Sequence, residues 1–280
     1  MTALLPASRT ADVTTTAATA QDVRLDAVER SFPIARGTRR VLRGIDLDIR
    51  AGEIVAVVGP SGCGKSTLLR LVGGLDAPSR GSIRIGGTAV ADVDERTAVA
   101  FQEPRLLPWR TIAQNVELGL PRGTGRRAGR ARVQELLHLV GLDHAADQRP
   151  REVSGGMAQR ASLARALARN PSVLLLDEPF GALDALTRLR MHDLLLKIHA
   201  AEPTTVLLVT HDVEEALYLA DRVLLLRTLG DHDHASVART IEVPGARPRD
   251  RADRGLADLR ADLLEGLGVD THHRSTEETR

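Results

Sequence analysis

This chain of 280 residues contains very little lysine, few aromatic residues and a single cysteine. Only Lys65 and Lys197 among its 38 basic residues are lysines, and Phe, Trp and Tyr together make up 2% of the chain. The single cysteine, Cys63, excludes an intrachain disulfide and a cysteine metal cluster, which suits a reducing compartment. No apolar run approaches the roughly 18 residues of a membrane-spanning helix. A membrane role would therefore depend on a partner.

The chain also lacks an excess of charge of either sign. Its 38 basic and 37 acidic residues give a formal net charge of +1, which provides no electrostatic support for binding nucleic acid or an anionic membrane surface. The N-terminus has neither the basic start nor the apolar centre of a secretory signal. We predict that residues 1–21, which are rich in Thr and Ala, form a disordered leader.

The N-terminal part has the pattern of antiparallel strands. Ile45, Leu47 and Ile49 alternate with charged residues, which is the period of a half-buried strand, and residues 23–32 are also strand-like. Residues 82–90 predict a hairpin that turns at Gly86–Gly87. Continuous apolar runs at 54–59, 172–178 and 204–211 instead favour central strands of a parallel sheet that is covered on both faces.

Helical patterns separate these apolar runs. Apolar positions at helical spacing predict a helix that ends at Gly141, another that begins after Ser154, a third over 186–200 and a short fourth within 253–269. The residues expected on their buried faces are Val133, Leu136, Leu137, Val140, Leu186, Leu189, Leu194, Leu256, Leu259, Leu263 and Leu264. The fold class is therefore α/β with an antiparallel flank. We place the main domain at 22–230, its helical insertion at about 104–165 and a C-terminal extension with one short helix at 231–280.

The segment GPSGCGKST predicts a phosphate-binding loop, because a strand precedes it and a helix follows it. Its residues are Gly59, Pro60, Ser61, Gly62, Cys63, Gly64, Lys65, Ser66 and Thr67. Glycines let successive N–H groups turn inward around a phosphate, and the following helix points its positive end there. The compact ammonium of Lys65 can reach between phosphates where a planar guanidinium would be too wide. Ser66 offers a hydroxyl to Mg²⁺. The alternative is a chance glycine-rich turn. Such a turn needs neither a strand before it nor a helix after it, and this segment has both.

A second chemical signal comes where SVLLLDE ends. Asp177 is placed to hold Mg²⁺ directly or through water, and Glu178 to activate a water molecule for attack on a phosphate. Taken alone, this pair could be an ordinary polar strand end. His211 ends another apolar run, where it can bond a phosphate, although taken alone it is better explained as a structural histidine. We expect His138, His144, His192 and His199 at the surface.

The segment VSGGMAQR, residues 153–160, resembles the signature motif of the nucleotide-binding subunits of ATP-binding-cassette (ABC) transporters, and the resemblance extends over nearly all of residues 22–228. It implies a P-loop NTPase cassette with a RecA-like parallel-sheet core. It also implies an ATP-sandwich dimer, in which Ser154, Gly155 and Gly156 of each copy close over ATP held by the other. Val153 and Met157 depart from the usual Leu and Gln of this motif.

The same resemblance assigns further residues. Gln102 matches the glutamine that binds Mg²⁺ and links the state of ATP to the helical insertion, and Asp184 lies in a loop where two subunits touch. Phe32 is the candidate for stacking on adenine, although a core role fits it equally well. Leu106, Leu107, Pro108 and Trp109 form either local packing of the insertion or a socket for a membrane subunit.

Residues 101–120 and 179–198 are similar to importers of sulfonates, nitrate and taurine, and the segment around SGGMAQRASLARAL most resembles those for aliphatic sulfonates. This implies an ATPase at the cytoplasmic face of the cell membrane, held by two transmembrane permease subunits and working indirectly with a solute-binding protein, with no nucleic acid. Import of taurine or nitrate is the alternative within this class. A soluble ABC ATPase without a transport role is the alternative from another class.

Overall fold

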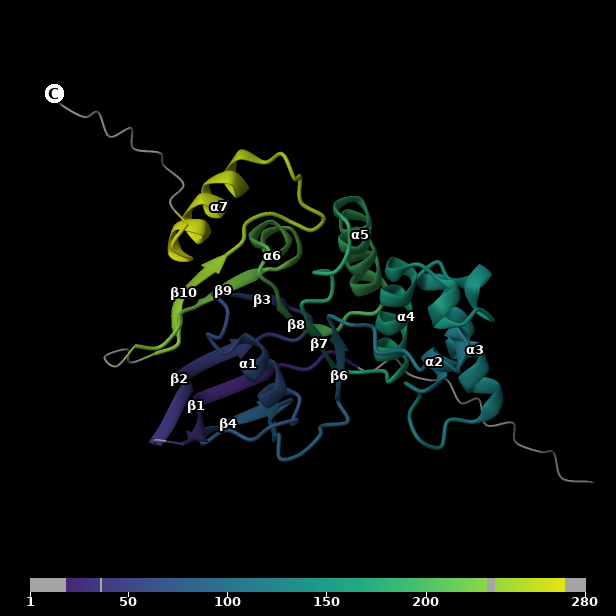
Figure 1. The fold of residues 1–280 in the computed structure, drawn as a ribbon, viewed down its shortest axis with the longest axis horizontal. Coiled ribbons are helices and arrows are strands. Elements are labelled where there is room, and N and C mark those ends of the chain that lie inside the picture. The colour runs from purple at the N-terminus through teal and green to yellow at the C-terminus, as the bar shows by residue number, and fades with distance from the viewer. Residues whose placement is uncertain (1–18, 36, 231–234, 270–280) are drawn as a thin grey trace, which may run out of the picture.

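The computed structural model describes residues 19–35, 37–230 and 235–269. Two β-sheets and the helices around them make up this part of the chain, with one lobe of helices at one end (Figure 1). The α/β class predicted from the sequence is confirmed. Of the predicted leader, residues 1–18 lie outside the described residues.

The smaller sheet is the antiparallel flank. Its strand order is β2-β1-β4-β5. The strands are β1 (Val23–Ile34), β2 (Gly37–Ile49), β4 (Arg80–Ile85) and β5 (Thr88–Ala89). The predicted hairpin turns at Gly86 and Gly87, which both have positive φ, so that Ile85 pairs with Thr88. Ile45, Leu47 and Ile49 are buried as predicted, because alternate side chains of a strand point to opposite faces.

The larger sheet carries the parallel core, in the order β10-β9-β3-β8-β7-β6. Its strands are β3 (Ile54–Val58), β6 (Thr97–Phe101), β7 (Val173–Asp177), β8 (Thr205–Val209), β9 (Arg222–Leu226) and β10 (Val237–Glu242). The predicted apolar runs are the neighbouring strands β3, β8 and β7, which pair in parallel. The sequence did not indicate β9 as a strand, and β10 pairs with it in antiparallel fashion. β10 lies within the residues that we assigned to the C-terminal extension.

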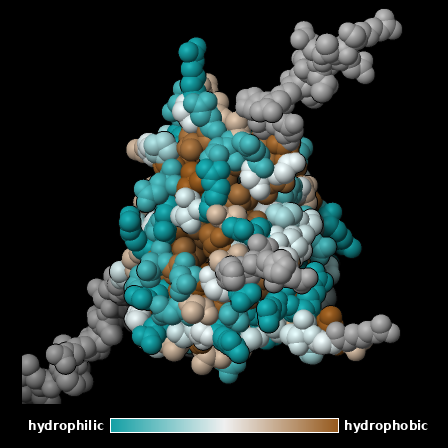
Figure 2. Space-filling view, turned by 90° about the vertical axis from the view of Figure 1, so that its left-hand side faces the viewer, coloured by the Kyte–Doolittle hydropathy of each residue, from teal (hydrophilic) through white to brown (hydrophobic). Residues whose placement is uncertain are grey.

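Helices cover both faces of the larger sheet. They are α1 (Lys65–Val72), α2 (Ile112–Glu117), α3 (Arg126–Leu139), α4 (Gly155–Ala168), α5 (Ala185–Ala201), α6 (Val213–Leu219) and α7 (Arg254–Gly266). One core cluster contains α1 and residues of both sheets, and the other packs the remaining helices on the opposite face. Figure 2 views the end at the left of Figure 1, where hydrophilic residues surround a central hydrophobic area.

The predicted buried face of α5 was wrong for two of its three leucines, whereas the third, Leu194, packs partly buried against the core. Leu186 is 58% exposed and Leu189 is 40% exposed, whereas Met191, Leu195 and Ile198 are buried. Leucines occur on several sides of this helix, so its periodicity does not select a face, and packing against the sheet and α6 makes the choice. By contrast, the four core positions predicted for α3 and its C-cap residue Val140 are all buried.

One histidine that we predicted at the surface is instead buried. His192 is 2% exposed, between Phe180 and Tyr218, whose ring centroids lie 5.3 and 6.1 Å from its own. Its Nε2 lies 3.4 Å from Oε2 of the buried Glu215. Residue type alone suggested the surface, but this position falls on the face of α5 that packs against α6. His199 is half-buried, and the remaining two predicted surface histidines, at 138 and 144, are exposed.

Candidate functional site

The glycine-rich loop connects the end of β3 with the start of α1. Gly62 and Gly64 have φ of 80° and 104°, a region that side chains with a Cβ rarely adopt. A Cβ at Gly64 would also stand 2.6 Å from Leu42 Cδ2. Both backbone conformation and space therefore require glycine here, and the bare backbone leaves the amide groups accessible at the N-terminus of α1.

The side chain of Lys65 is buried inside this loop and bonds to its backbone. Its Nζ donates hydrogen bonds to the carbonyl oxygens of Gly59 and Pro60, at 2.8 and 3.2 Å, and the residue is only 8% exposed. No carboxylate of the described residues lies within ion-pair distance of its ammonium. A buried cation that is solvated only by carbonyl oxygens favours an anion beside it, so the loop is suited to a phosphate group.

Ser66 and Asp177 form the second part of the site. Asp177 is the last residue of β7, and its Oδ1 accepts a hydrogen bond of 3.0 Å from the Ser66 hydroxyl. Hydroxyl and carboxylate oxygens are hard ligands of the kind that Mg²⁺ takes, usually together with phosphate oxygens and water. The pair beside the loop therefore fits Mg²⁺.

Three predicted residues meet at the carboxyl ends of neighbouring strands. Phe101, Asp177 and Val209 pair in register across β6, β7 and β8, so the residues that follow them emerge at one edge. Glu178 Oε2 lies 3.2 Å from His211 Nδ1. A Cβ at Gly181 would stand 3.3 Å from Gln102 Nε2 and 3.5 Å from His211 Cε1. The fold thus brings Glu178, His211 and Gln102 together.

The backbone of Glu178 is also unusual. Its φ is +47°, although it is not glycine, and its N–H donates a 2.8 Å hydrogen bond to the carbonyl oxygen of Val209. Positive φ in a residue with a long side chain costs free energy, and such strain concentrates at functional sites. The conformation turns the chain away from β7 immediately after Asp177.

A cavity of about 500 Å³ joins the phosphate loop to the antiparallel sheet. Six of the nine predicted loop residues and Glu178 line it. The other three, Gly59, Pro60 and Cys63, shape the loop instead. Cys63 is 2% exposed within the core, and burial raises the pKa of its thiol.

The rim of this cavity comes from β1 and β2. Phe32, the candidate for stacking on adenine, lies there together with Ile34, Arg39 and Val41, which the sequence did not indicate. The Arg30 guanidinium lies 4.4 Å from the centroid of the Phe32 ring and covers one face of it. Stacking of adenine on Phe32 stays a prediction. Phe32 pairs with Arg39 in the β1–β2 register, and only that register could have revealed Arg39.

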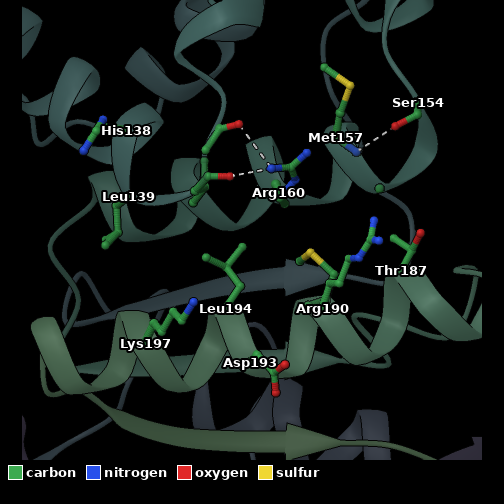
Figure 3. A pocket seen from close by; sticks show the side chains of 14 residues that line it. His138, Leu139, Ser154, Met157, Arg160, Thr187, Arg190, Asp193, Leu194 and Lys197 are labelled. Atoms are coloured by element: carbon green, nitrogen blue, oxygen red, sulfur yellow. Dashed lines mark hydrogen bonds between the residues drawn. The ribbon is translucent and has the colours of Figure 1, made fainter.

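The turn Ser154–Gly156 lies elsewhere in the same chain. Ser154 caps α4 by accepting a hydrogen bond of 3.3 Å from the Met157 N–H. Ser154 and Gly156 line a separate cavity of about 570 Å³ between α4 and α5, which shares no lining residue with the first (Figure 3). One chain therefore does not bring its two glycine-rich helix starts into one cavity.

Two further predicted segments lie at the surface. Asp184 caps α5, and hydrogen bonds from the backbone and side chain of Thr187 lower the pKa of its carboxyl. Trp109 is 68% exposed, whereas Leu106 packs against the core. Thus Leu106 anchors the segment 106–109 while Trp109 is exposed, and a socket for a membrane subunit stays a prediction.

A strand, a phosphate loop and a helix, with an acidic pair at the end of a nearby parallel strand, define a P-loop nucleotide hydrolase. A family model described as ABC transporter matches residues 42–181. The chain belongs to the ABC transporter family, and its fold is the ATP-binding cassette.

Relatives and solved structures agree with this family. The aliphatic sulfonates import ATP-binding protein SsuB 1 of Streptomyces avermitilis is 49% identical over 95% of this chain and 93% of that protein. The protein SsuB of Granulibacter bethesdensis, with the same descriptive name, is 51% identical over 88% of this chain and 94% of its own. A dimeric post-hydrolysis structure of the ATP-binding cassette MJ0796, bound to ADP and Pi, is 34% identical, with a TM-score of 0.69, and covers 80% of this chain and 100% of that one.

Proposed function

We propose that this chain is the ATP-hydrolysing subunit of an ABC importer for aliphatic sulfonates. The names of its relatives support the substrate, because about half of the residues are identical over nearly the full length. The observation that carries the ATPase is the set of contacts around the phosphate loop: Lys65 held by loop carbonyls and Ser66 bonded to Asp177. Import of taurine or nitrate would use the same site.

In the proposed site, the loop amides and Lys65 bind the phosphates of ATP. Ser66 and Asp177 would hold Mg²⁺, with Gln102 at the same edge of the sheet. The metal, when bound, neutralises the negative charge of the phosphates. Phe32 and Arg39 lie at the end of the cavity where the nucleoside would be placed.

Glu178 and His211 would carry the hydrolytic step. The Glu178 carboxylate accepts a proton from the attacking water and orients it toward the γ-phosphate. His211 bonds the γ-phosphate through its imidazole, while its Nδ1 faces Glu178 Oε2. Lys65 adds positive charge where negative charge develops in the transition state.

The separation of the two glycine-rich turns supports a dimer. The Ser154–Gly156 turn presents backbone N–H groups at the N-terminus of α4, an arrangement that suits an anion, yet it does not face the chain's own loop. Two copies arranged head to tail would complete two ATP sites. The related cassette MJ0796 has been solved as a dimer.

The chain would reach the membrane through other subunits. None of the helices in the described part of the chain combines the length and apolar character that crossing a bilayer requires. The exposed Trp109, beside the half-buried Leu107, offers an apolar contact for the permease subunits. Those subunits, supplied by a solute-binding protein, would hold the chain at the cytoplasmic face of the membrane.

The test uses Glu178→Gln, which keeps the side-chain shape and removes the base. We expect hydrolysis to fall about a hundredfold or more, and light scattering to show dimers with magnesium and ATP.

Co-purified permease subunits in vesicles, with the solute-binding protein, should show ATPase activity that an alkanesulfonate stimulates. Stimulation by taurine or nitrate alone would favour the alternative substrates. A chain that neither dimerises nor co-purifies with membrane subunits would favour an ATPase without a transport role.

A further inference from the structure

Arg188 joins two loops that the proposed mechanism treats separately. It lies in the first turn of α5, where its N–H donates a 2.9 Å hydrogen bond to the Asp184 carbonyl oxygen. Its Nη2 donates to the carbonyl oxygen of Leu183, at 3.1 Å, and its Nη1 to Oδ2 of Asp212, at 3.2 Å. One guanidinium therefore holds the loop that precedes α5 and the loop that follows β8.

The two carboxylate oxygens of Asp212 accept hydrogen bonds from different groups. Its Oδ1 caps α6 by accepting from the N–H groups of Glu214 and Glu215, at 2.9 and 3.1 Å. Its Oδ2 accepts from Arg188. Because Asp212 directly follows His211, the position of the imidazole depends on how this carboxylate is held.

These contacts form a closed path through the catalytic pair. From Glu178, hydrogen bonds of 3.2 Å (Gly181 N–H to Glu178 O) and 3.1 Å (Leu183 N–H to Phe180 O) shape the turns that lead to Leu183. Arg188 then connects Leu183 with Asp212. His211 returns to Glu178 through the 3.2 Å contact between Nδ1 and Oε2. Arg188 is the charged link that closes this path.

The same turn of α5 also contacts the second glycine-rich helix start. A Cβ at Gly156 would stand 2.7 Å from Cγ2 of Thr187, the residue before Arg188. Figure 3 shows Thr187 on α5 opposite Ser154 and Met157 of α4. The first turn of α5 thus touches the Ser154–Gly156 turn through Thr187 and the His211 loop through Arg188.

We propose that Arg188 is a positioning residue that ties the subunit-contact loop of Asp184 to the His211 loop. This rests on the proposed dimer, in which Asp184 and Ser154–Gly156 meet the partner. Contact of the partner subunit with these segments then sets the relative positions of Glu178 and His211 through the Arg188 guanidinium. Hydrolysis of ATP in one site responds to the nucleotide in the other, because one helical turn contacts parts of both.

The pair is suited to this role by its chemistry and surroundings. The side chains of Arg188 and Asp212 are 29% and 26% exposed, so water screens their attraction only in part. A guanidinium donates in a fixed fork, whereas an ammonium on a flexible stem cannot hold the same two acceptors in one plane. Lysine at this position should therefore keep the charge and lose the geometry.

The experiment compares Arg188→Gln and Arg188→Lys with Arg130→Gln, which removes an exposed arginine of α3 that has no hydrogen-bond or ion-pair partner among the described residues. We measure the melting temperature, ATP binding by the isolated subunit, kcat and the dependence of rate on ATP concentration. We expect both Arg188 variants to bind ATP normally, to lose about tenfold to a hundredfold in kcat, and to show a Hill coefficient that falls towards about 1. Arg130→Gln should behave as wild type.

A double-mutant cycle with Asp212→Asn isolates the contact, because asparagine is also a good helix cap. The double variant Arg188→Gln/Asp212→Asn should be no slower than the slower single variant. Wild-type kcat and cooperativity in Arg188→Lys, or additive losses in the double variant, would overturn the proposal. Failure of Glu178→Gln, with Arg188 intact, to dimerise with ATP would instead contradict the proposed function.

Discussion

Ser66 and Asp177 are 111 residues apart in the sequence, yet the serine hydroxyl donates a 3.0 Å hydrogen bond to the aspartate carboxylate. The contact exists because β3, which leads into the phosphate loop, and β7, which ends at Asp177, both pair with β8 in parallel. The carboxyl ends of parallel strands lie at one edge of a sheet, where ligands of such folds bind.

This contact predicts a metal requirement. Asp177→Asn keeps the hydrogen bond from Ser66 but removes a negative charge from the proposed Mg²⁺ site. We expect the Mg²⁺ concentration for half-maximal ATPase activity to rise about tenfold or more. Titration of Mg²⁺ at saturating ATP measures this. Asp258→Asn, an exposed aspartate of α7, is the control, and an unchanged Mg²⁺ requirement in Asp177→Asn would contradict the assignment.

We predict that the segment containing the exposed Trp109 depends on the buried side chain of Asn115 for its conformation. This residue is 0% exposed, accepts a hydrogen bond from the Leu107 N–H and donates to the carbonyl oxygens of Leu107, Arg110 and Thr111. Asn115→Ala removes all four bonds and leaves the Leu107 N–H and the Arg110 carbonyl oxygen without these partners, while the carbonyl oxygens of Leu107 and Thr111 keep their backbone donors. We estimate the cost at about 2 kcal/mol. We expect the melting temperature to fall by about 4–8 °C.

The same variant separates hydrolysis from coupling. The phosphate loop is untouched, so ATPase activity of the isolated subunit below the melting temperature should remain. Stimulation by permease subunits in vesicles should fall, because the loop around Trp109 loses its anchor. The neighbouring exposed residue provides the control: Gln114→Ala removes a capping-box side chain of α2 without touching the Asn115 contacts. Equal coupling in Asn115→Ala and wild type would argue against this role.

The buried Glu215 predicts a pH dependence of stability. Burial raises the pKa of its carboxyl above the ordinary value of 4.5, with His192 opposing the shift. The folded state therefore holds a proton that the unfolded state releases, and stability from this group declines as pH rises from about 4.5 through the raised pKa. Glu215→Gln should raise the melting temperature relative to wild type by an amount that grows over this pH range.

Thermal melts between pH 5 and pH 8 measure this difference. Glu214→Gln, at the exposed neighbouring position on α6, is the matched control and should show no such trend. A gap between Glu215→Gln and wild type that stays constant with pH would show that the carboxyl titrates alike in the folded and unfolded chain.

Cys63 predicts slow thiol chemistry in the native protein. The residue is 2% exposed, and burial raises the pKa of its thiol, so little reactive thiolate forms near neutral pH. A disulfide reagent such as Ellman's should label the unfolded chain at once and the folded chain at the rate of opening. Cys63→Ala controls for background, and rapid labelling without denaturant would refute the buried position.

The sequence predicted the phosphate loop and the acidic pair because their chemistry is local. Consecutive residues form the Gly59–Thr67 loop, and the apolar run before Asp177 marks a central strand by its length and composition. Periodicity likewise placed α3 and its buried face. The same reasoning failed for α5, whose leucines occur on several sides, and for His192, whose burial depends on its neighbours on α6.

By itself, the amino-acid order determined the α/β class, the phosphate loop and the candidate residues for hydrolysis, because each follows from residue type and short-range spacing. Only the tertiary structure decided that Ser66 meets Asp177, that Glu178 meets His211 and that Arg188 links two loops. Those contacts depend on strand order and register, which distant parts of the chain set together through burial of a common core. The separation of Ser154–Gly156 from the phosphate loop is likewise a property of the packed chain.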